Sequence, residues 1–184
     1  NKKLANDIKS LKAFGVDKNY NQRDYPGKYD VNKLGLNYRM SEIHASIGVE
    51  QIKKFKRFSI IRKKNFNYLY KKLSKNKNFK ILLSTNKKFE TSYYCMSIVL
   101  NKKFERNRTK IIQSLNKKGI GTSIYYPKPV PLMTYYKKKY NTKSSNFKNA
   151  LAISNRSIAI PVAPHVKQKD LTHIVKKIEE IVKV

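Results

Sequence analysis

The longest regular pattern of hydrophobic positions lies between residues 41 and 75. Apolar side chains recur there in steps of three to five residues, as one face of a helix requires: Ile43, Ile47, Ile52, Phe55, Phe58, Ile61, Phe66, Leu69 and Leu73. Ser41 is a suitable N-cap, and Glu42 places negative charge at the helix N-terminus. Such a helix extends about 50 Å, whereas a compact globule of this length is roughly 40 Å across. The pattern therefore predicts a helix that bridges two domains or packs on a partner subunit.

The residues before this helix predict a short helix and a long loop. Leu4, Ile8 and Leu11 recur at helical spacing and indicate an amphipathic helix over residues 3–14, ended by Gly15. Residues 16–40 carry Asp, Asn, Gly and Pro with scattered aromatic residues, which is typical of a binding or interface loop. Because the chain opens at Asn1 directly in a helical pattern, we expect it to be cut at its N-terminal side.

After residue 76 the pattern alternates between strands and helices. Strands are predicted at residues 79–83, 93–100, 121–126 and 157–161, and helices at 109–118, 147–154 and 170–183. Prolines at positions 127, 129 and 131 exclude regular helix or ladder pairing between them. This alternation predicts a small α/β domain.

Charge adds a second hypothesis about function. The 184 residues contain 42 Lys and Arg against 11 Asp and Glu, a net charge of +31, but the basic residues are spread along the whole chain. Lys outnumbers Arg, whereas bidentate contacts to phosphate or guanine favour Arg. The chain has 40% hydrophobic residues, with 13 Tyr and 8 Phe, and this content excludes a disordered polybasic tail. Solvated basic faces are favoured, and a non-catalytic module that binds nucleic acid or an anionic surface remains the alternative.

Cysteine and histidine provide little chemistry. Cys95 has no partner for an internal disulfide and is predicted to be a buried strand thiol. His44, His165 and His173 are scattered and poor in acidic or cysteine neighbours, so no metal site is predicted. No apolar stretch reaches the roughly 18 residues that a membrane span needs, and no leader precedes the first helix, so a cytoplasmic location without a membrane partner is expected.

Two segments resemble a known family. The first, Gly-Leu-Asn-Tyr-Arg-Met-Ser-Glu at residues 35–42, continues to Gln51, with Arg62 and residues 68–73 further along the helix. It closely resembles the signature of the DegT/DnrJ/StrS family of pyridoxal-phosphate-dependent nucleotide-sugar aminotransferases. The second comprises residues 119–133, followed by 158–165, and matches that family's C-terminal half in order and spacing. The resemblance covers nearly the whole chain.

The resemblance implies the C-terminal part of a fold type I aminotransferase, in which a long interdomain helix joins a small mixed sheet packed with helices. Residues 1–40 would be a remnant of the large cofactor domain and an interface loop, residues 41–75 the linking helix, and residues 76–184 the small C-terminal α/β domain. It also implies a homodimer that uses pyridoxal 5'-phosphate to transfer an amino group from an amino-acid donor, glutamate, to a nucleotide-linked keto-sugar.

The resemblance also assigns candidate site residues. In the family, the asparagine of the first motif reaches across the dimer to the neighbouring cofactor's phosphate, so Asn37 is the expected contact, with Arg39 as a second cofactor-binding candidate. Tyr125 and Tyr126 occupy the position of the family's His-Tyr pair facing the sugar nucleotide and are the substrate-binding candidates. The plainer alternatives are a turn residue for Asn37, an ion pair with Glu42 for Arg39, and ordinary strand residues for the tyrosines.

No catalytic residue is identified in this chain. The family's reaction needs a Schiff-base lysine, an acidic residue at the pyridine nitrogen and a group packed on the ring, and none of these motifs is recognisable here. The chain alone is therefore predicted to be inactive. A stand-alone dimerisation or regulatory domain is a third hypothesis.

Overall fold

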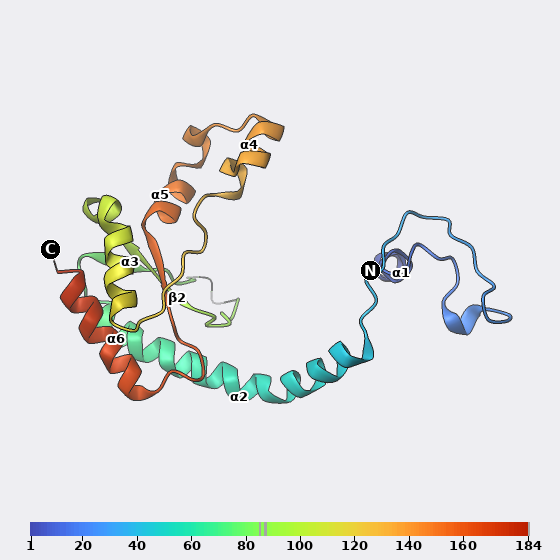
Figure 1. Ribbon diagram of the computed structural model, residues 1–184, viewed down its shortest axis with the longest axis horizontal. Coiled ribbons are helices and arrows are strands. Elements are labelled where there is room, and N and C mark those ends of the chain that lie inside the picture. The colour runs from blue at the N-terminus through green and yellow to red at the C-terminus, as the bar shows by residue number, and fades with distance from the viewer. Residues whose placement is uncertain (85, 87, 184) are drawn as a thin grey trace. The chain divides into compact units, whose positions relative to one another are not determined.

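The computed structural model describes residues 1–84, 86 and 88–183, and it divides into two compact units (Figure 1). Unit 1 comprises residues 1–54 and unit 2 residues 55–184. The boundary falls within helix α2 (Glu42–Leu73), so the two ends of this helix belong to different units. The long helix predicted from the sequence is confirmed, and its bounds agree within two residues.

Unit 1 consists of helix α1 (Lys2–Leu11), a short 3-10 helix (Tyr20–Gln22) and a long loop. The predicted helix over residues 3–14 is wrong at its end, because Phe14 and Gly15 both take left-handed backbone conformations with φ of 67° and 78°. The loop returns to the end of α1, where the Leu36 amide donates to the Leu11 carbonyl at 2.8 Å. These backbone contacts fix the segment that carries the first family-like motif.

Helix α2 begins at the residue that the sequence indicates. The His44 amide donates to the Ser41 Oγ at 3.3 Å, which satisfies one of the free N–H groups of the first turn. Burial along the helix is uneven: Ile43 and Ile52 are exposed, whereas Leu69 and Leu73 are completely buried. Neither α2 nor another helix of the described residues is both long and apolar enough to cross a bilayer.

Unit 2 is built on a three-stranded antiparallel sheet in the order β1 (Phe79–Ile81), β2 (Met96–Leu100) and β3 (Ser157–Ile160). Three helices pack with it to form the core: the second half of α2, α3 (Arg108–Lys117) and α6 (Gln168–Ile181). In Figure 1, α3 and α6 lie side by side. Apolar side chains of the helices and of all three strands form one continuous cluster.

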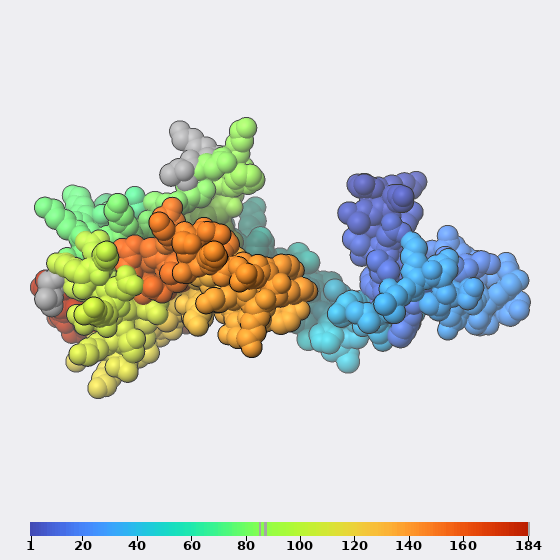
Figure 2. All heavy atoms as spheres, turned by 90° about the horizontal axis from the view of Figure 1, so that it is seen from above, coloured from blue at the N-terminus to red at the C-terminus, as the bar shows by residue number. Residues whose placement is uncertain are grey.

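The two remaining α-helices described in unit 2 lie between α3 and β3 in the sequence. Helix α4 (Thr134–Tyr140) has no buried residue, and α5 (Lys148–Arg156) leads directly into β3. In the space-filling view these two helices (orange) stand at the surface of unit 2 (Figure 2). The sequence predicted α5 within two residues, but it did not predict α4.

Two strand predictions need correction. The strand predicted over residues 121–126 is absent except for one isolated bridge, in which Ser123 and Ala159 exchange backbone hydrogen bonds of 3.2 and 2.8 Å. The prolines that follow limit further pairing, because they donate no N–H group. The strand predicted over residues 93–100 begins only at Met96, since Tyr93 has a positive φ of 49°. Cys95 therefore precedes the strand and is half-buried, so the prediction of a buried strand thiol is wrong.

Candidate functional site

Asn37 and Arg39 lie in the loop that is fixed to the end of α1. Both side chains are exposed, and the Arg39 amide donates to the Asn37 Oδ1 over 3.4 Å. This contact uses the amide oxygen of Asn37 and leaves its Nδ2 group available as a donor. The Arg39 guanidinium lies 5.2 Å from the centre of the Phe14 ring, and no carboxylate of the described residues forms an ion pair with it. The alternative pairing of Arg39 with Glu42 is therefore not present.

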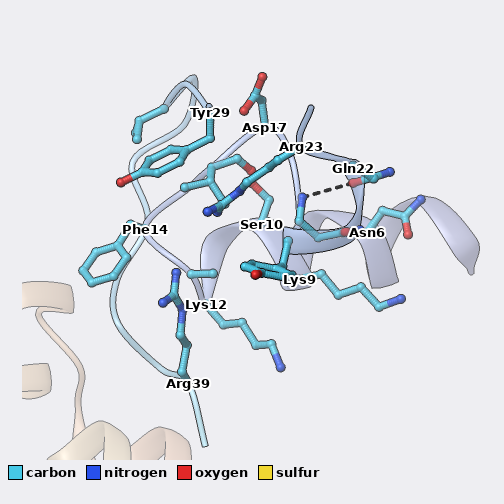
Figure 3. A pocket seen from close by; sticks show the side chains of 15 residues that line it. Asn6, Lys9, Ser10, Lys12, Phe14, Asp17, Gln22, Arg23, Tyr29 and Arg39 are labelled. Carbon is cyan, nitrogen blue, oxygen red and sulfur yellow. Dashed lines mark hydrogen bonds between the residues drawn. The ribbon is translucent and has the colours of Figure 1, made fainter. Parts of the chain in front are cut away.

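A cavity of about 940 Å³ lies in unit 1 beside this loop (Figure 3). Four cationic side chains and one carboxylate line it: Lys9, Lys12, Arg23, Arg39 and Asp17. The excess of positive charge within one concave surface favours an anionic ligand. The Arg39 side chain extends from the loop toward Phe14 at the edge of this cavity (Figure 3).

Arg23 is the most enclosed of these cations. Its guanidinium stacks over the Tyr29 ring at 4.4 Å, and its Nη2 donates to the Lys18 carbonyl at 3.5 Å. The Nε atom is buried and has no hydrogen-bond partner among the described residues. An unpaired buried donor costs free energy, so this side of the cavity favours a ligand that supplies an acceptor.

A second cavity, of about 320 Å³, lies entirely within unit 2. It is lined by Arg62 of α2, by Tyr94 and Cys95 before β2, and by Tyr125 near the isolated bridge. Residues 121–123 and 159–163 complete the lining. The Tyr94 and Tyr125 ring centres are 5.9 Å apart. The hydrogen-bonding interaction with Tyr125 raises the pKa of the Tyr94 phenol above its usual value, because it favours the neutral form of the phenol.

The walls of this second cavity are held by helix α2. Arg62 donates from Nη1 to the Tyr94 carbonyl at 3.2 Å. One turn further, the buried Asn65 donates from Nδ2 to the carbonyls of Val162, Ala163 and Val166 at 3.1 to 3.3 Å. The helix therefore fixes both the segment before β2 and the segment after β3, and the cavity between them is preorganised.

The structure brings the predicted site residues together in two pairs. Asn37 and Arg39 share the loop of unit 1, whereas Tyr125 lines the cavity of unit 2 and Tyr126 lies beside it, with ring centres 5.7 Å apart. Sequence reasoning did not select Arg62 or Tyr94 as site residues, nor the cations of the first cavity. Arg62 could have been noticed, because it is a charged residue among apolar positions of the long helix.

The histidines have structural partners. His44 Nδ1 lies 2.8 Å from the Ser41 Oγ, and His173 Nε2 lies 2.9 Å from the Lys118 carbonyl oxygen. Within the part of the chain that the structure describes, no three His, Cys, Asp or Glu side chains are grouped to hold a metal ion.

Comparison with known proteins matches the chain to a family. The model of the DegT/DnrJ/EryC1/StrS aminotransferase family matches residues 1–179. The chain is 29% identical to the uncharacterized protein MJ1066 of Methanocaldococcus jannaschii, over 99% of this chain and 48% of that protein. It is 28% identical to the UDP-4-amino-4,6-dideoxy-N-acetyl-beta-L-altrosamine transaminase of Campylobacter jejuni, over 92% of this chain and 43% of that enzyme. The chain therefore spans less than half the length of these two relatives.

A solved structure shows the same fold. The Streptococcus pneumoniae protein Spr1654 in its PMP form superposes with a TM-score of 0.87 at 21% identity, over 99% of this chain and 45% of that one. At this identity the likeness concerns the fold alone.

Proposed function

Since the chain belongs to the DegT/DnrJ/EryC1/StrS aminotransferase family, we propose that it forms the C-terminal part of an enzyme that transfers an amino group from glutamate to a nucleotide-linked keto-sugar. The resemblance and the fold class predicted from the sequence are confirmed by the family match and by the shared fold. One observation carries the proposal: the family-like loop presents the side chains of Asn37 and Arg39 at the surface, beside a cationic cavity.

The donors of this loop fit a cofactor phosphate. The Asn37 Nδ2 and the Arg39 guanidinium are exposed donors, and the lysines and arginines around the adjoining cavity favour negative charge. We assign Asn37 and Arg39 to the phosphate of pyridoxal phosphate, which when bound supplies the electron sink for amino transfer. The PMP form of the Spr1654 structure supports this cofactor.

Tyr125 and Tyr126 are the proposed contacts for the nucleotide-sugar substrate. Tyr125 is partly exposed in the second cavity and Tyr126 is exposed beside it, so both phenols are accessible to a ligand. The Campylobacter jejuni relative, a transaminase of a UDP-linked amino sugar, supports this substrate class.

We further propose a homodimer. Apolar side chains in the first half of α2 and on α1 are exposed in the single chain, and they include Ile43 at 74% and Ile52 at 76% exposure. Large apolar side chains that are exposed along a helix mark an interaction surface, and a second copy would cover them. The three-part division at residues 40 and 75 and the cytoplasmic location stay predictions.

The 184-residue chain alone is proposed to be inactive. No lysine of the described residues is buried, so none has the desolvated setting that activates an amine for Schiff-base formation. Incubation with pyridoxal phosphate, borohydride reduction and peptide mass spectrometry should therefore find no single lysine modified stoichiometrically. Turnover with glutamate by this chain would contradict the proposal.

The assignment of Asn37 is tested in a chimera that joins the region of the Campylobacter jejuni enzyme preceding its matched part to residues 1–184. Replacing Asn37 by Ala should weaken pyridoxal phosphate binding by about tenfold or more, since a hydrogen bond to a charged group is lost. The exposed Asn32, in the same loop, gives the matched control Asn32→Ala. Equal cofactor affinity of the two variants, measured by absorbance titration, would exclude Asn37 from the phosphate site.

A further inference from the structure

The second cavity contains a guanidinium whose charge is unpaired. Arg62 is half-buried, and its Nη1 donates one hydrogen bond to the Tyr94 carbonyl. Its other N–H groups have no hydrogen-bond partner among the described residues. Glu90 forms an ion pair with the neighbouring Lys63 at 3.3 Å, and no ion pair of Arg62 is found among the described residues. A half-buried cation without an anion, facing a concave surface, is a binding group for an anionic ligand.

Two phenols complete the donor set. Tyr94 and Tyr125 line the same cavity as Arg62, and the Arg62 guanidinium lies 5.8 Å from the centre of the Tyr94 ring. A neutral phenol donates one hydrogen bond. The interaction with Tyr125 raises the pKa of Tyr94 and so favours the neutral phenol, which is the form that donates.

The charge and volume of the cavity select the kind of anion. One guanidinium balances one negative charge, and its planar fork matches the two oxygens of a carboxylate. A diphosphate carries more charge than this single cation can balance. The volume of about 320 Å³ lies at the low end for small-molecule sites, which fits an amino acid better than a nucleotide.

We propose that Arg62, Tyr94 and Tyr125 bind a carboxylate of the amino donor. The assignment rests on the proposed function, in which the amino donor and the nucleotide-linked keto-sugar bind in separate half-reactions, so that Tyr125 contacts each substrate in turn. It extends that function by separating two charged groups: the cations of unit 1 for phosphate and Arg62 for the carboxylate of the donor. Asn65 acts as a positioning residue, because its three hydrogen bonds hold the wall formed by residues 162–166.

Binding to the 184-residue chain itself gives the first test. Glutarate and pyrophosphate are titrated separately while the ring signals of ¹³C-labelled tyrosine are followed by NMR. Glutarate should saturate shifts of Tyr94 and Tyr125, and Arg62→Gln should weaken its binding by about ten- to a hundredfold, as expected for a charged hydrogen-bonding partner. Arg57 lies on the same helix outside the cavity, so Arg57→Gln is the matched control and should leave the affinity unchanged.

A conservative variant separates the charge from the geometry. Arg62→Lys keeps the charge but loses the planar fork, so it should bind glutarate more weakly than the native chain and more tightly than Arg62→Gln. Circular dichroism of each variant verifies folding. Pyrophosphate binding that depends on Arg62 and exceeds that of glutarate would assign the cavity to a phosphate source, and equal affinities of Arg62→Gln and Arg57→Gln would refute the site.

Kinetics of the chimera distinguish this inference from the proposed function. Arg62→Gln should raise the KM for glutamate by about tenfold or more and leave the KM for the nucleotide sugar unchanged. If the Arg62→Gln chimera transaminates with an unaltered KM for glutamate, the carboxylate site is refuted and the proposed function is not. If the chimera binds glutarate through Arg62 but shows no transamination, the proposed function is refuted and the carboxylate site is not.

Discussion

Units 1 and 2 are stabilised in different ways. Unit 2 has a continuous apolar core to which α2, α3, α6 and all three strands contribute. In residues 1–54, all of which the structure describes, Val16 is the only buried hydrophobic residue, and no side chain of α1 is buried. Hydrophobic burial therefore stabilises unit 2, while unit 1 depends on contacts of another kind.

Backbone contacts take that role in unit 1. The amides of Phe14, Leu36 and Tyr38 connect the end of α1 with the returning loop at 2.8 to 3.1 Å. Gly15 and Gly35 allow this approach, since a Cβ on Gly35 would lie 2.2 Å from the Gly15 nitrogen. The comparison teaches that the cavity proposed for the amino donor belongs to a unit that folds around its own core. The loop of Asn37 and Arg39 instead depends on close backbone contacts or on a partner that covers its apolar side chains.

The largest expected effect tests the difference in cores. Leu69→Ala in unit 2 should lower the free energy of unfolding by about 2–5 kcal/mol, because it leaves a cavity among completely buried side chains. Ile52→Ala on the exposed half of the same helix should change it by less than about 0.5 kcal/mol in the monomer. Urea unfolding at low protein concentration measures both values. A similar cost at the two positions would show that α2 is covered along its whole length.

A smaller, local effect is expected in unit 1. Gly35→Ala forces a Cβ against backbone atoms of Phe14 and Gly15 and should separate the loop from α1. Hydrogen exchange of the Leu36 and Tyr38 amides should then become faster, while amides of β2 keep their protection. Gly48→Ala is the control, because nothing lies within 4 Å of its added Cβ and Ala favours the helix. Unchanged exchange at Leu36 would mean that the backbone contacts do not hold unit 1.

The smallest effect concerns one titration in unit 2. Tyr125→Phe should lower the pKa of Tyr94 toward the usual value of about 10, because the interaction that favours the neutral phenol is removed. In the native chain this interaction stabilises the fold below the usual pKa, and the contribution is lost as the pH rises through the raised one. NMR titration of labelled tyrosine gives the pKa, with Tyr126→Phe as control. If the cavity belongs to unit 2 alone, Gly35→Ala will leave the pKa of Tyr94 unchanged.

Local patterns predicted the elements that have strong periodicity. The long helix follows from apolar spacing and its Ser41 cap, and α3, α5, α6 and β3 agree with prediction within two residues. Errors arose where backbone conformation overrides pattern. Positive φ at Phe14 shortened the first helix, and positive φ at Tyr93 delayed β2. Neither conformation can be recognised from side-chain hydrophobicity.

The candidate site was only partly visible in the sequence. Asn37, Arg39, Tyr125 and Tyr126 came from motif resemblance. In the structure Arg39 lines the cavity of unit 1 and Tyr125 that of unit 2, whereas Asn37 and Tyr126 lie beside them. Arg62 and Tyr94 are 32 positions apart, and nothing in their spacing indicates that one donates to the carbonyl of the other. Their relation depends on the packing of α2 against the sheet.

The sequence by itself determined the strongly periodic helices, the family and the positive charge of this protein, because hydrophobic periodicity, motif residues and composition are local properties of the chain. Only the tertiary structure decided that the Arg62 guanidinium has no ion-pair partner among the described residues and that it lies beside the phenols of Tyr94 and Tyr125. Those relations arise from long-range packing, above all from the three carbonyls that Asn65 binds about a hundred residues away.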